Sequence, residues 1–195
     1  MSGVTLEALG LSLKNQTVVV ADLADVGQRL LNHRIEVILG REIFDAARLQ
    51  IDIDGRRIGV VSRSQQPPGV QLDLVTEHGV ETAAVRVENS AARATLDLGN
   101  GSHVLISKSF ATRLKLLTDG RPVTPQRGGG LGGAASRQVV TLRVLDVAGR
   151  RFHNVKAAID PQPSASEVNI GVSVLRHFRI TTDYLNHLVW LDRRD

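Results

Sequence analysis

The chain has 195 residues, which suits one domain or two small ones and is ample for a buried core. Aromatic residues make up only 3% and the net charge of +4 is spread along the chain, so the stacking platforms and dense basic patches of nucleic-acid-binding proteins are not expected. Cysteine is absent, which excludes disulfides, thiolate metal sites and cysteine nucleophiles. The six histidines show no His-x-x-x-His spacing, and we expect neither a metal nor another cofactor.

No window approaches the ~18 uninterrupted apolar residues that a membrane-spanning helix requires, so we expect no membrane span. The first ten residues, MSGVTLEALG, lack the basic start and apolar run of a signal peptide. The chain as given therefore has the sequence character of a soluble protein, and its compartment is left open.

Segment 62–69, Ser-Arg-Ser-Gln-Gln-Pro-Pro-Gly, has the composition of a linker. We therefore predict a first unit at residues 1–61 and a second at 70–195. In the second unit, apolar alternation and Gly-containing turns predict strands. The strands expected there are 70–75, 82–87, 92–97, 139–147, 152–159 and 180–192, with turns at 78–79, 148–151 and 186–187. Apolar spacing of helical period predicts a helix from Ser107 to Leu117, capped by Ser107, and a short one over 172–178.

The most informative pattern is an internal repeat. Residues 36–40, Glu-Val-Ile-Leu-Gly, align with residues 167–171, Glu-Val-Asn-Ile-Gly, at an offset of 131, which also places Arg48 on Arg179 and Asp52 on Asp183. Upstream, Val-Thr-Leu at 4–6 recurs at 140–142, an offset of 136. Residues 4–61 thus look like a copy of 140–192, and the stretch from about 80 to 139 has no counterpart in the first unit.

Three motifs suggest chemistry. Residues 94–102, Ala-Thr-Leu-Asp-Leu-Gly-Asn-Gly-Ser, place Asp97 in a tight loop after a strand, where Gly99 lets the backbone turn closely beside the carboxylate. A glycine-rich run, Gly-Gly-Gly-Leu-Gly-Gly at 128–133, follows 31 residues later and suits a bending hairpin. Each repeat then has apolar residues, a glycine and a short helix, at Leu39-Gly40 and at Ile170-Gly171.

In this order the motifs resemble the retropepsin-like and pepsin-like aspartic peptidases, fully over residues 80–192 and partly over the first unit. The resemblance implies an all-β fold of acid-protease-like barrel lobes with short helices, one lobe complete and the preceding lobe represented by its C-terminal half. It implies that Asp97 is the catalytic carboxylate, supported by Leu98, Gly99 and Asn100. It further implies a flap over substrate formed by Gly130, Leu131, Gly132 and Gly133, and packing of Leu39, Gly40, Ile170 and Gly171 beneath the catalytic loops.

Two residues depart from the family pattern. Leu98 stands where the family has a Thr or Ser whose hydroxyl joins the two catalytic loops, and Asn169 stands at an apolar position. Asp52 and Asp183 lie in strand contexts without an Asp-x-Gly turn, and we interpret both as structural.

The function expected from the resemblance is hydrolysis of peptide bonds in a peptide or protein substrate by an Asp-activated water, which requires a second carboxylate. That acid would come from a homodimer mate or from a segment upstream of Met1. Bacterial two-lobed proteins of this type are often exported, so a signal segment could belong to the same upstream part. The alternative is a catalytically inactive β-rich domain that binds peptides or acts as a scaffold.

Overall fold

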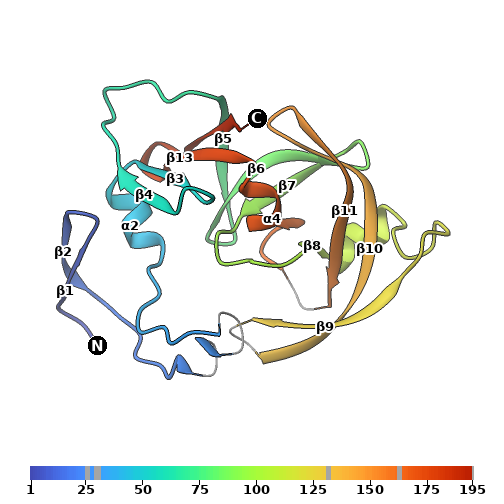
Figure 1. The fold of residues 1–195 in the computed structure, drawn as a ribbon, viewed down its shortest axis with the longest axis horizontal. Coiled ribbons are helices and arrows are strands. Elements are labelled where there is room, and N and C mark those ends of the chain that lie inside the picture. The colour runs from blue at the N-terminus through green and yellow to red at the C-terminus, as the bar shows by residue number, and fades with distance from the viewer. Residues whose placement is uncertain (25–26, 29–31, 131–132, 162–163, 195) are drawn as a thin grey trace.

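The structure is a computed structural model that describes residues 1–24, 27–28, 32–130, 133–161 and 164–194. The described residues form mostly strands, with a few short helices between them (Figure 1). The first unit contains β1 (Val4–Ala8), β2 (Leu11–Gln16), α2 (Arg41–Ala46), β3 (Leu49–Asp52) and β4 (Arg57–Val60). The second begins with β5 (Val70–Glu77), β6 (Val80–Val87), β7 (Ser90–Leu96), β8 (Val104–Ser107) and α3 (Lys108–Arg113). It continues with β9 (Thr124–Gly130), β10 (Gly133–Val147), β11 (Arg150–Asp160), β12 (Val168–Ile170), α4 (Val172–Leu175), β13 (Phe178–Asp183), the 3₁₀ turn η2 (Tyr184–Asn186) and β14 (Leu188–Arg193).

The strands between residues 74 and 170 close into a small barrel. Its strands follow the order β6-β7-β12-β8-β11-β10, and a short pairing of β10 with β6 closes the ring. Strand β12 lies between β7, to which it is parallel, and β8, to which it is antiparallel. The principal core fills this barrel, and its largest fully buried side chains include Phe110, Leu142, Leu145 and Ile170. The fold is thus all-β with short helices, as the sequence analysis predicted.

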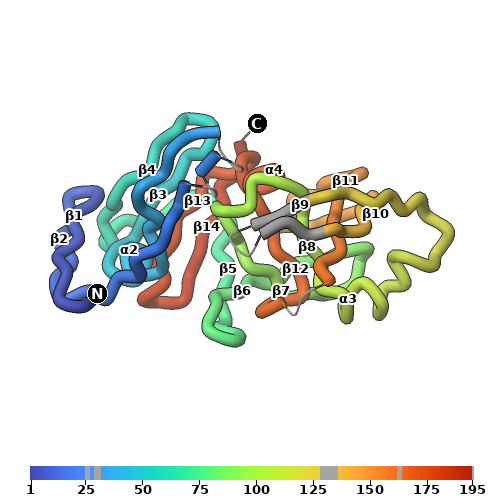
Figure 2. Tube along the Cα trace, turned by 90° about the horizontal axis from the view of Figure 1, so that it is seen from below, coloured from blue at the N-terminus to red at the C-terminus, as the bar shows by residue number. Residues whose placement is uncertain are grey.

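A second antiparallel sheet joins the two units in the order β4-β3-β13-β14-β5. Strand β5 belongs to both sheets, because residues 70–73 pair with β14 and residues 74–77 pair with β6. In Figures 1 and 2 strands β1 to β4 of the first unit, in blue and cyan, lie to the left of the barrel strands, and β3 and β4 form one end of this sheet. The hairpin β1–β2 forms a separate two-stranded sheet at the far end.

The joining sheet relates the two repeats by an approximate twofold axis. In the pairing of β3 with β13, Gln50 lies opposite Thr181, its own counterpart at the offset of 131. On one side of this pair Asp52 lies opposite Arg179, and on the other side Arg48 contacts Asp183, so equivalent residues are exchanged across the axis. The hairpins agree less closely with the sequence alignment. Both turn through two left-handed residues, at 9–10 and at 148–149, which gives an offset of 139 rather than 136.

Local expectations in the second unit are largely matched by the structure. Ser107 Oγ accepts a hydrogen bond from the Phe110 N–H and caps α3, although that helix ends at Arg113 rather than near Leu117. His78 and Gly79 adopt positive φ in the turn between β5 and β6. The turn at Ala148 and Gly149 is two residues long, shorter than the predicted 148–151, because β11 already begins at Arg150.

Segment 62–69 contains no strand but is held in place. The Arg48 guanidinium donates to the carbonyls of Ser62, Arg63 and Gln65. Gly69, at φ +95°, passes so close to the backbone of Asp192 that a Cβ would lie 2.5 Å from it. The segment therefore connects the units along a fixed path, and the division at 62–69 remains a prediction.

Candidate active site

Asp97 lies immediately after β7, where the barrel opens. Its N–H donates to the Ile170 carbonyl on the neighbouring strand β12 at 2.8 Å, and its own carbonyl accepts from the Asn100 N–H at 3.3 Å. These backbone bonds make 97–100 a tight loop anchored to a buried strand. The sequence analysis predicted this setting from the strand, Asp, x, Gly pattern.

The Asp97 side chain is half-buried, and both carboxylate oxygens have a donor. Oδ1 accepts from the Gly99 N–H at 2.8 Å, and Oδ2 accepts from the Asn169 side-chain amide at 2.8 Å. Asn169 in turn accepts from the Asn100 side chain, also at 2.8 Å. The carboxylate is therefore fixed in one orientation by its own loop and by β12.

The residue after Asp97 does not take part in this network. Leu98 is half-buried and packs against the principal core, as an apolar side chain should. It anchors the loop through apolar contact. The polar contacts to the carboxylate come instead from Gly99 and Asn169, and Asn100 supports Asn169.

The glycine-rich run forms part of a hairpin, as its composition suggested. Strands β9 and β10 pair antiparallel from Thr124 opposite Val139 to Gly130 opposite Gly133. Leu131 and Gly132, the other two predicted flap residues, lie outside the described residues. At the base of this hairpin Gln126 Oε1 lies 2.9 Å from His103 Nε2, which connects the hairpin to the end of the Asp97 loop.

The apolar-Gly-helix element of the second repeat packs directly against the Asp97 loop. Ile170 is completely buried, and the Val172 N–H donates to the Asn100 carbonyl at 2.8 Å. A Cβ on Gly171 would lie 2.2 Å from that carbonyl oxygen. Only glycine fits between β12, α4 and the loop.

The same element of the first repeat has no such loop against it among the described residues. Gly40 has backbone angles like those of Gly171, but a Cβ there would meet only the flexible side chain of Glu42. Leu39 is 41% exposed, whereas its counterpart Ile170 is buried. The two predicted packing elements thus have the same local form and different surroundings.

Neither of the other two aspartates in the repeat joins Asp97 in the described contacts. Asp52 accepts from the Gly55 N–H at 2.6 Å and pairs with Arg194. Asp183 is fully buried and receives Arg48, Arg63 and Asn186. These contacts agree with the structural role inferred for both residues.

Tyr184 lies within electrostatic range of the site. Burial raises the pKa of Tyr184 to about 12, and the negative charges of Glu81, Asp45 and Asp97 add to this effect, while Arg41 opposes it. The ring stacks on Phe44 of α2 at 5.4 Å between centroids. Tyr184 therefore stays a neutral phenol that packs the first repeat against the second.

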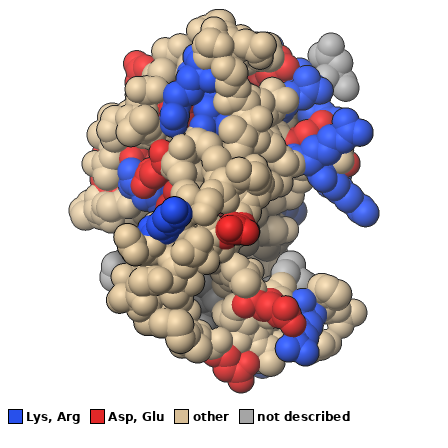
Figure 3. Space-filling model, turned by 90° about the vertical axis from the view of Figure 1, so that its left-hand side faces the viewer, with Lys and Arg blue, Asp and Glu red and all other residues tan. Residues whose placement is uncertain are grey.

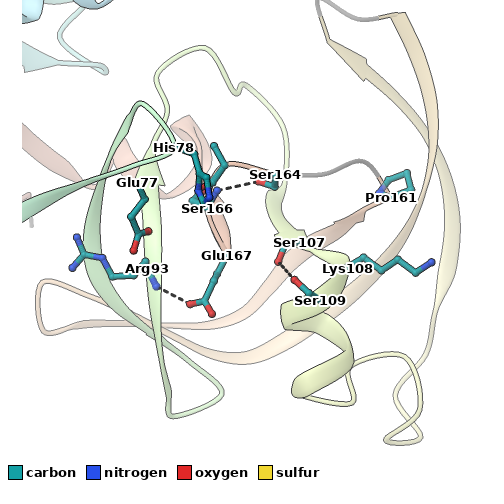
Figure 4. A pocket seen from close by; sticks show the side chains of 11 residues that line it. Glu77, His78, Arg93, Ser107, Lys108, Ser109, Pro161, Ser164, Ser166 and Glu167 are labelled. Carbon is teal, nitrogen blue, oxygen red and sulfur yellow. Dashed lines mark hydrogen bonds between the residues drawn. The ribbon is translucent and has the colours of Figure 1, made fainter.

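The two cavities best defined in the described structure lie apart from the Asp97 carboxylate. The larger, about 650 Å³, is lined by residues of the β5–β6 turn, the start of α3, Pro161 and residues 164–167 (Figure 4). There the Glu167 carboxylate accepts from the Arg93 backbone N–H, and Ser107 contacts Ser109. The smaller, about 370 Å³, lies between β11 and α4 and is lined in part by His103, His153 and His177. Within the described residues no group of three or more His, Asp or Glu side chains is placed to hold a metal ion.

Comparison with known proteins shows a similarity to one family over part of the chain. Residues 83–174 match the family model described as "Aspartyl protease", a span that contains the Asp97 loop, the hairpin and Gly171. This part of the chain is therefore similar to the aspartyl protease family. Among solved structures, a retropepsin-like aspartic protease from Rickettsia conorii is similar, with 20% identity, a TM-score of 0.49, and coverage of 63% of this chain and 88% of that one. A search of curated proteins finds no match.

One contributor to the site was not predicted in its role. Asn169 was recognised only as a departure from an apolar pattern, and the structure places its amide on Asp97. The signal in the sequence was that departure itself, because a polar residue on a strand between buried neighbours needs a hydrogen-bonding partner.

Proposed function

We propose that the protein is an aspartic endopeptidase in which Asp97 activates the water that attacks a peptide bond. The observation that best supports this proposal is the Asp97 carboxylate, held at a loop tip by two N–H donors, in a loop whose end contacts the β9–β10 hairpin through His103 and Gln126. A carboxylate in this state is an acceptor and can act as a general base toward a bound water. The substrate class is an extended peptide, whose backbone the β9–β10 hairpin would cover.

The chemistry requires a second carboxylate, because one acid takes the proton of the water while the other polarises the scissile carbonyl. A homodimer mate or a segment N-terminal to the first unit would supply it. The surface around Gly40 in the first repeat has room for such a segment. A second strand-Asp-x-Gly loop packed on Gly40, as the Asp97 loop packs on Gly171, would bring its acid toward the approximate twofold axis.

The test is peptide hydrolysis at acidic pH by the chain and by Asp97→Asn. We expect the substitution to abolish cleavage, since the amide cannot accept the proton of the water. Asp73→Asn, the same chemical change at an exposed position on β5, serves as the matched control and should leave the rate unchanged.

A peptide that binds without being cleaved, equally well by the chain and by Asp97→Asn, would contradict the proposal. That result would favour the alternative, a β-rich domain that binds peptides without hydrolysing them.

A further inference from the structure

The Asp97 loop raises a question of positioning. The family that this lobe resembles fixes its catalytic aspartate through a hydroxyl on the following residue, which bonds across to the second loop. Leu98 has no hydroxyl, and its side chain is directed to the core. Something else must hold the carboxylate if it is to act on a bound water, because small errors in the placement of a reacting group lower the rate strongly.

The contacts around Asn100 settle which way each amide group points. The Ser102 N–H donates to Asn100 Oδ1 at 3.0 Å, and only an oxygen can accept it. Asn100 Nδ2 therefore faces the other way, where it donates to the His103 carbonyl at 3.0 Å and to Asn169 Oδ1 at 2.8 Å. The orientation of Asn100 is thus fixed by backbone groups of its own loop.

The orientation of Asn169 follows from that of Asn100. Because Asn169 accepts with Oδ1, its Nδ2 is left to donate to Asp97 Oδ2 at 2.8 Å. The chain of donors runs from Asn100 through Asn169 to the carboxylate, and the Gly99 N–H holds the other oxygen. Each oxygen of the Asp97 carboxylate thus accepts a hydrogen bond from an N–H group.

The backbone that carries Asn169 is itself rigid. Strand β12 pairs with β7 on one side and with β8 on the other, and the residues flanking Asn169, Val168 and Ile170, are fully buried. The corresponding residue of the first repeat is Ile38, which has no donor to offer. The amide is therefore not a packing requirement of the repeated motif, and it is found in the copy that contacts an aspartate loop.

We infer that Asn169 is the positioning residue for Asp97, and that the Asn100–Asn169 amide pair of the same lobe orients the Asp97 carboxylate. The inference rests on the proposed function only in naming Asp97 as the acting carboxylate. The pair does the work that a hydroxyl after the aspartate does in the related enzymes, without contact to a second loop.

The test replaces the donor by the residue of the first repeat, Asn169→Ile. With Asn169 gone the carboxylate can rotate, so exchange of the Gly99 amide hydrogen, followed by NMR, should become roughly five- to tenfold faster, as expected for one lost hydrogen bond. In Asp97→Ala the side-chain NH₂ resonances of Asn169 should move. If peptides are cleaved, kcat should fall on the order of 10- to 100-fold while KM changes little.

Thr95→Val is the matched control, because Thr95 lies opposite Asn169 in the strand pair but its hydroxyl bonds to Ser166. It should leave Gly99 exchange as in the parent chain. Asn100→Ala leaves the side chains of β12 unchanged and removes the hydrogen bond that orients the Asn169 amide, together with the contacts of Asn100 to Ser102 and His103. It provides a second measurement of Gly99 exchange should Asn169→Ile fail to fold.

Equal Gly99 exchange in Asn169→Ile and Thr95→Val, or Asn169 resonances that do not respond to Asp97→Ala, would overturn the inference. Absence of any peptide cleavage by the parent chain would count against the proposed function alone, since the exchange measurement does not depend on turnover.

Discussion

Gly171 and Gly40 occupy the same place in the two repeats, but the space that a Cβ would occupy is filled at Gly171 and nearly free at Gly40. Both cap a short helix with an extended backbone conformation that any residue can adopt, so neither is needed for its φ angle. The difference lies in what approaches them. The Asn100 carbonyl leaves no room for a Cβ at Gly171, whereas Gly40 faces only the Glu42 side chain.

We therefore expect Gly171→Ala to lower the free energy of unfolding by about 1–3 kcal/mol, the usual cost of overpacking a close contact. It should also displace the Asp97 loop. Gly40→Ala makes the same chemical change in the first repeat and should alter stability by less than about 0.5 kcal/mol. Urea unfolding measures the free energy of unfolding of both variants. Equal losses of stability would contradict the prediction that the close contact at Gly171 makes the difference.

Sequence reasoning at this scale identified the Asp97 loop because its signal is local: a strand, an aspartate and a glycine within a few residues. It did not predict the role of Asn169, because the interaction with Asp97 joins residues 72 positions apart. Only the pairing of β12 with β7 brings the two side chains together.

At the scale of elements, β3 and β13 carry crossed arginine and aspartate pairs around the approximate twofold axis. On one side, Arg48 donates through Nε and Nη2 to the fully buried Asp183, and its guanidinium lies 4.9 Å from the centroid of the buried Trp190 ring. On the other side, the pKa of the half-buried Asp52 is lowered by the Gly55 N–H and then by its ion pair with Arg194, and the exposed Arg179 adds a smaller electrostatic effect. One pair is therefore buried and its symmetry-related pair is not.

The buried pair makes stability depend on pH. Desolvation raises the pKa of Asp183, but hydrogen bonds from Asn186, Arg48 and Arg63 outweigh it and the net pKa is lowered. A carboxylate with a lowered pKa in the folded state stabilises the protein above its unfolded pKa, near 4, and this stabilisation is lost as the pH falls through the folded value.

Arg48→Met should cost about 3–5 kcal/mol at neutral pH, because it leaves a buried carboxylate without its principal cation. It should also reduce the dependence of stability on pH below about 4, since less of the Asp183 charge stabilisation remains to be lost. Arg179→Met is the matched control at the exposed pair, where about 0–1 kcal/mol is expected. Thermal and urea unfolding across pH measure both, and similar losses for the two variants would contradict this account.

At the scale of the whole molecule, the first unit is less well covered than the second. Val37, Ile38 and Leu39 are 65%, 53% and 41% exposed, although their counterparts in the second repeat form part of β12 between two strands. Val19 and Val20 are also exposed. On the face shown in Figure 3 acidic and basic side chains are interspersed over a mostly uncharged surface. No helix in the described part of the chain has the length and apolar character needed to cross a membrane.

Exposed apolar side chains on an uncovered segment favour association. We expect light scattering to show dimers or larger species whose proportion rises with concentration, and we expect Val37→Ser with Leu39→Ser to reduce it. Leu185→Ser, at a 61% exposed leucine in η2, is the control for a loss of apolar surface elsewhere. A chain that stays monomeric at all concentrations tested, or a control that reduces association equally, would contradict the prediction.

The sequence by itself determined the β-rich class, the strands and turns of the second unit, the Asp97 loop and the internal repeat, because each is encoded in short-range periodicity or in a direct match between segments. The tertiary structure alone decided that equivalent arginine and aspartate residues face one another across a twofold axis, that the hairpins align on their turns, and that an amide on β12 holds the carboxylate. These features depend on strand register and on packing between distant segments. A one-residue change in register would redirect every side chain, and no local pattern specifies it.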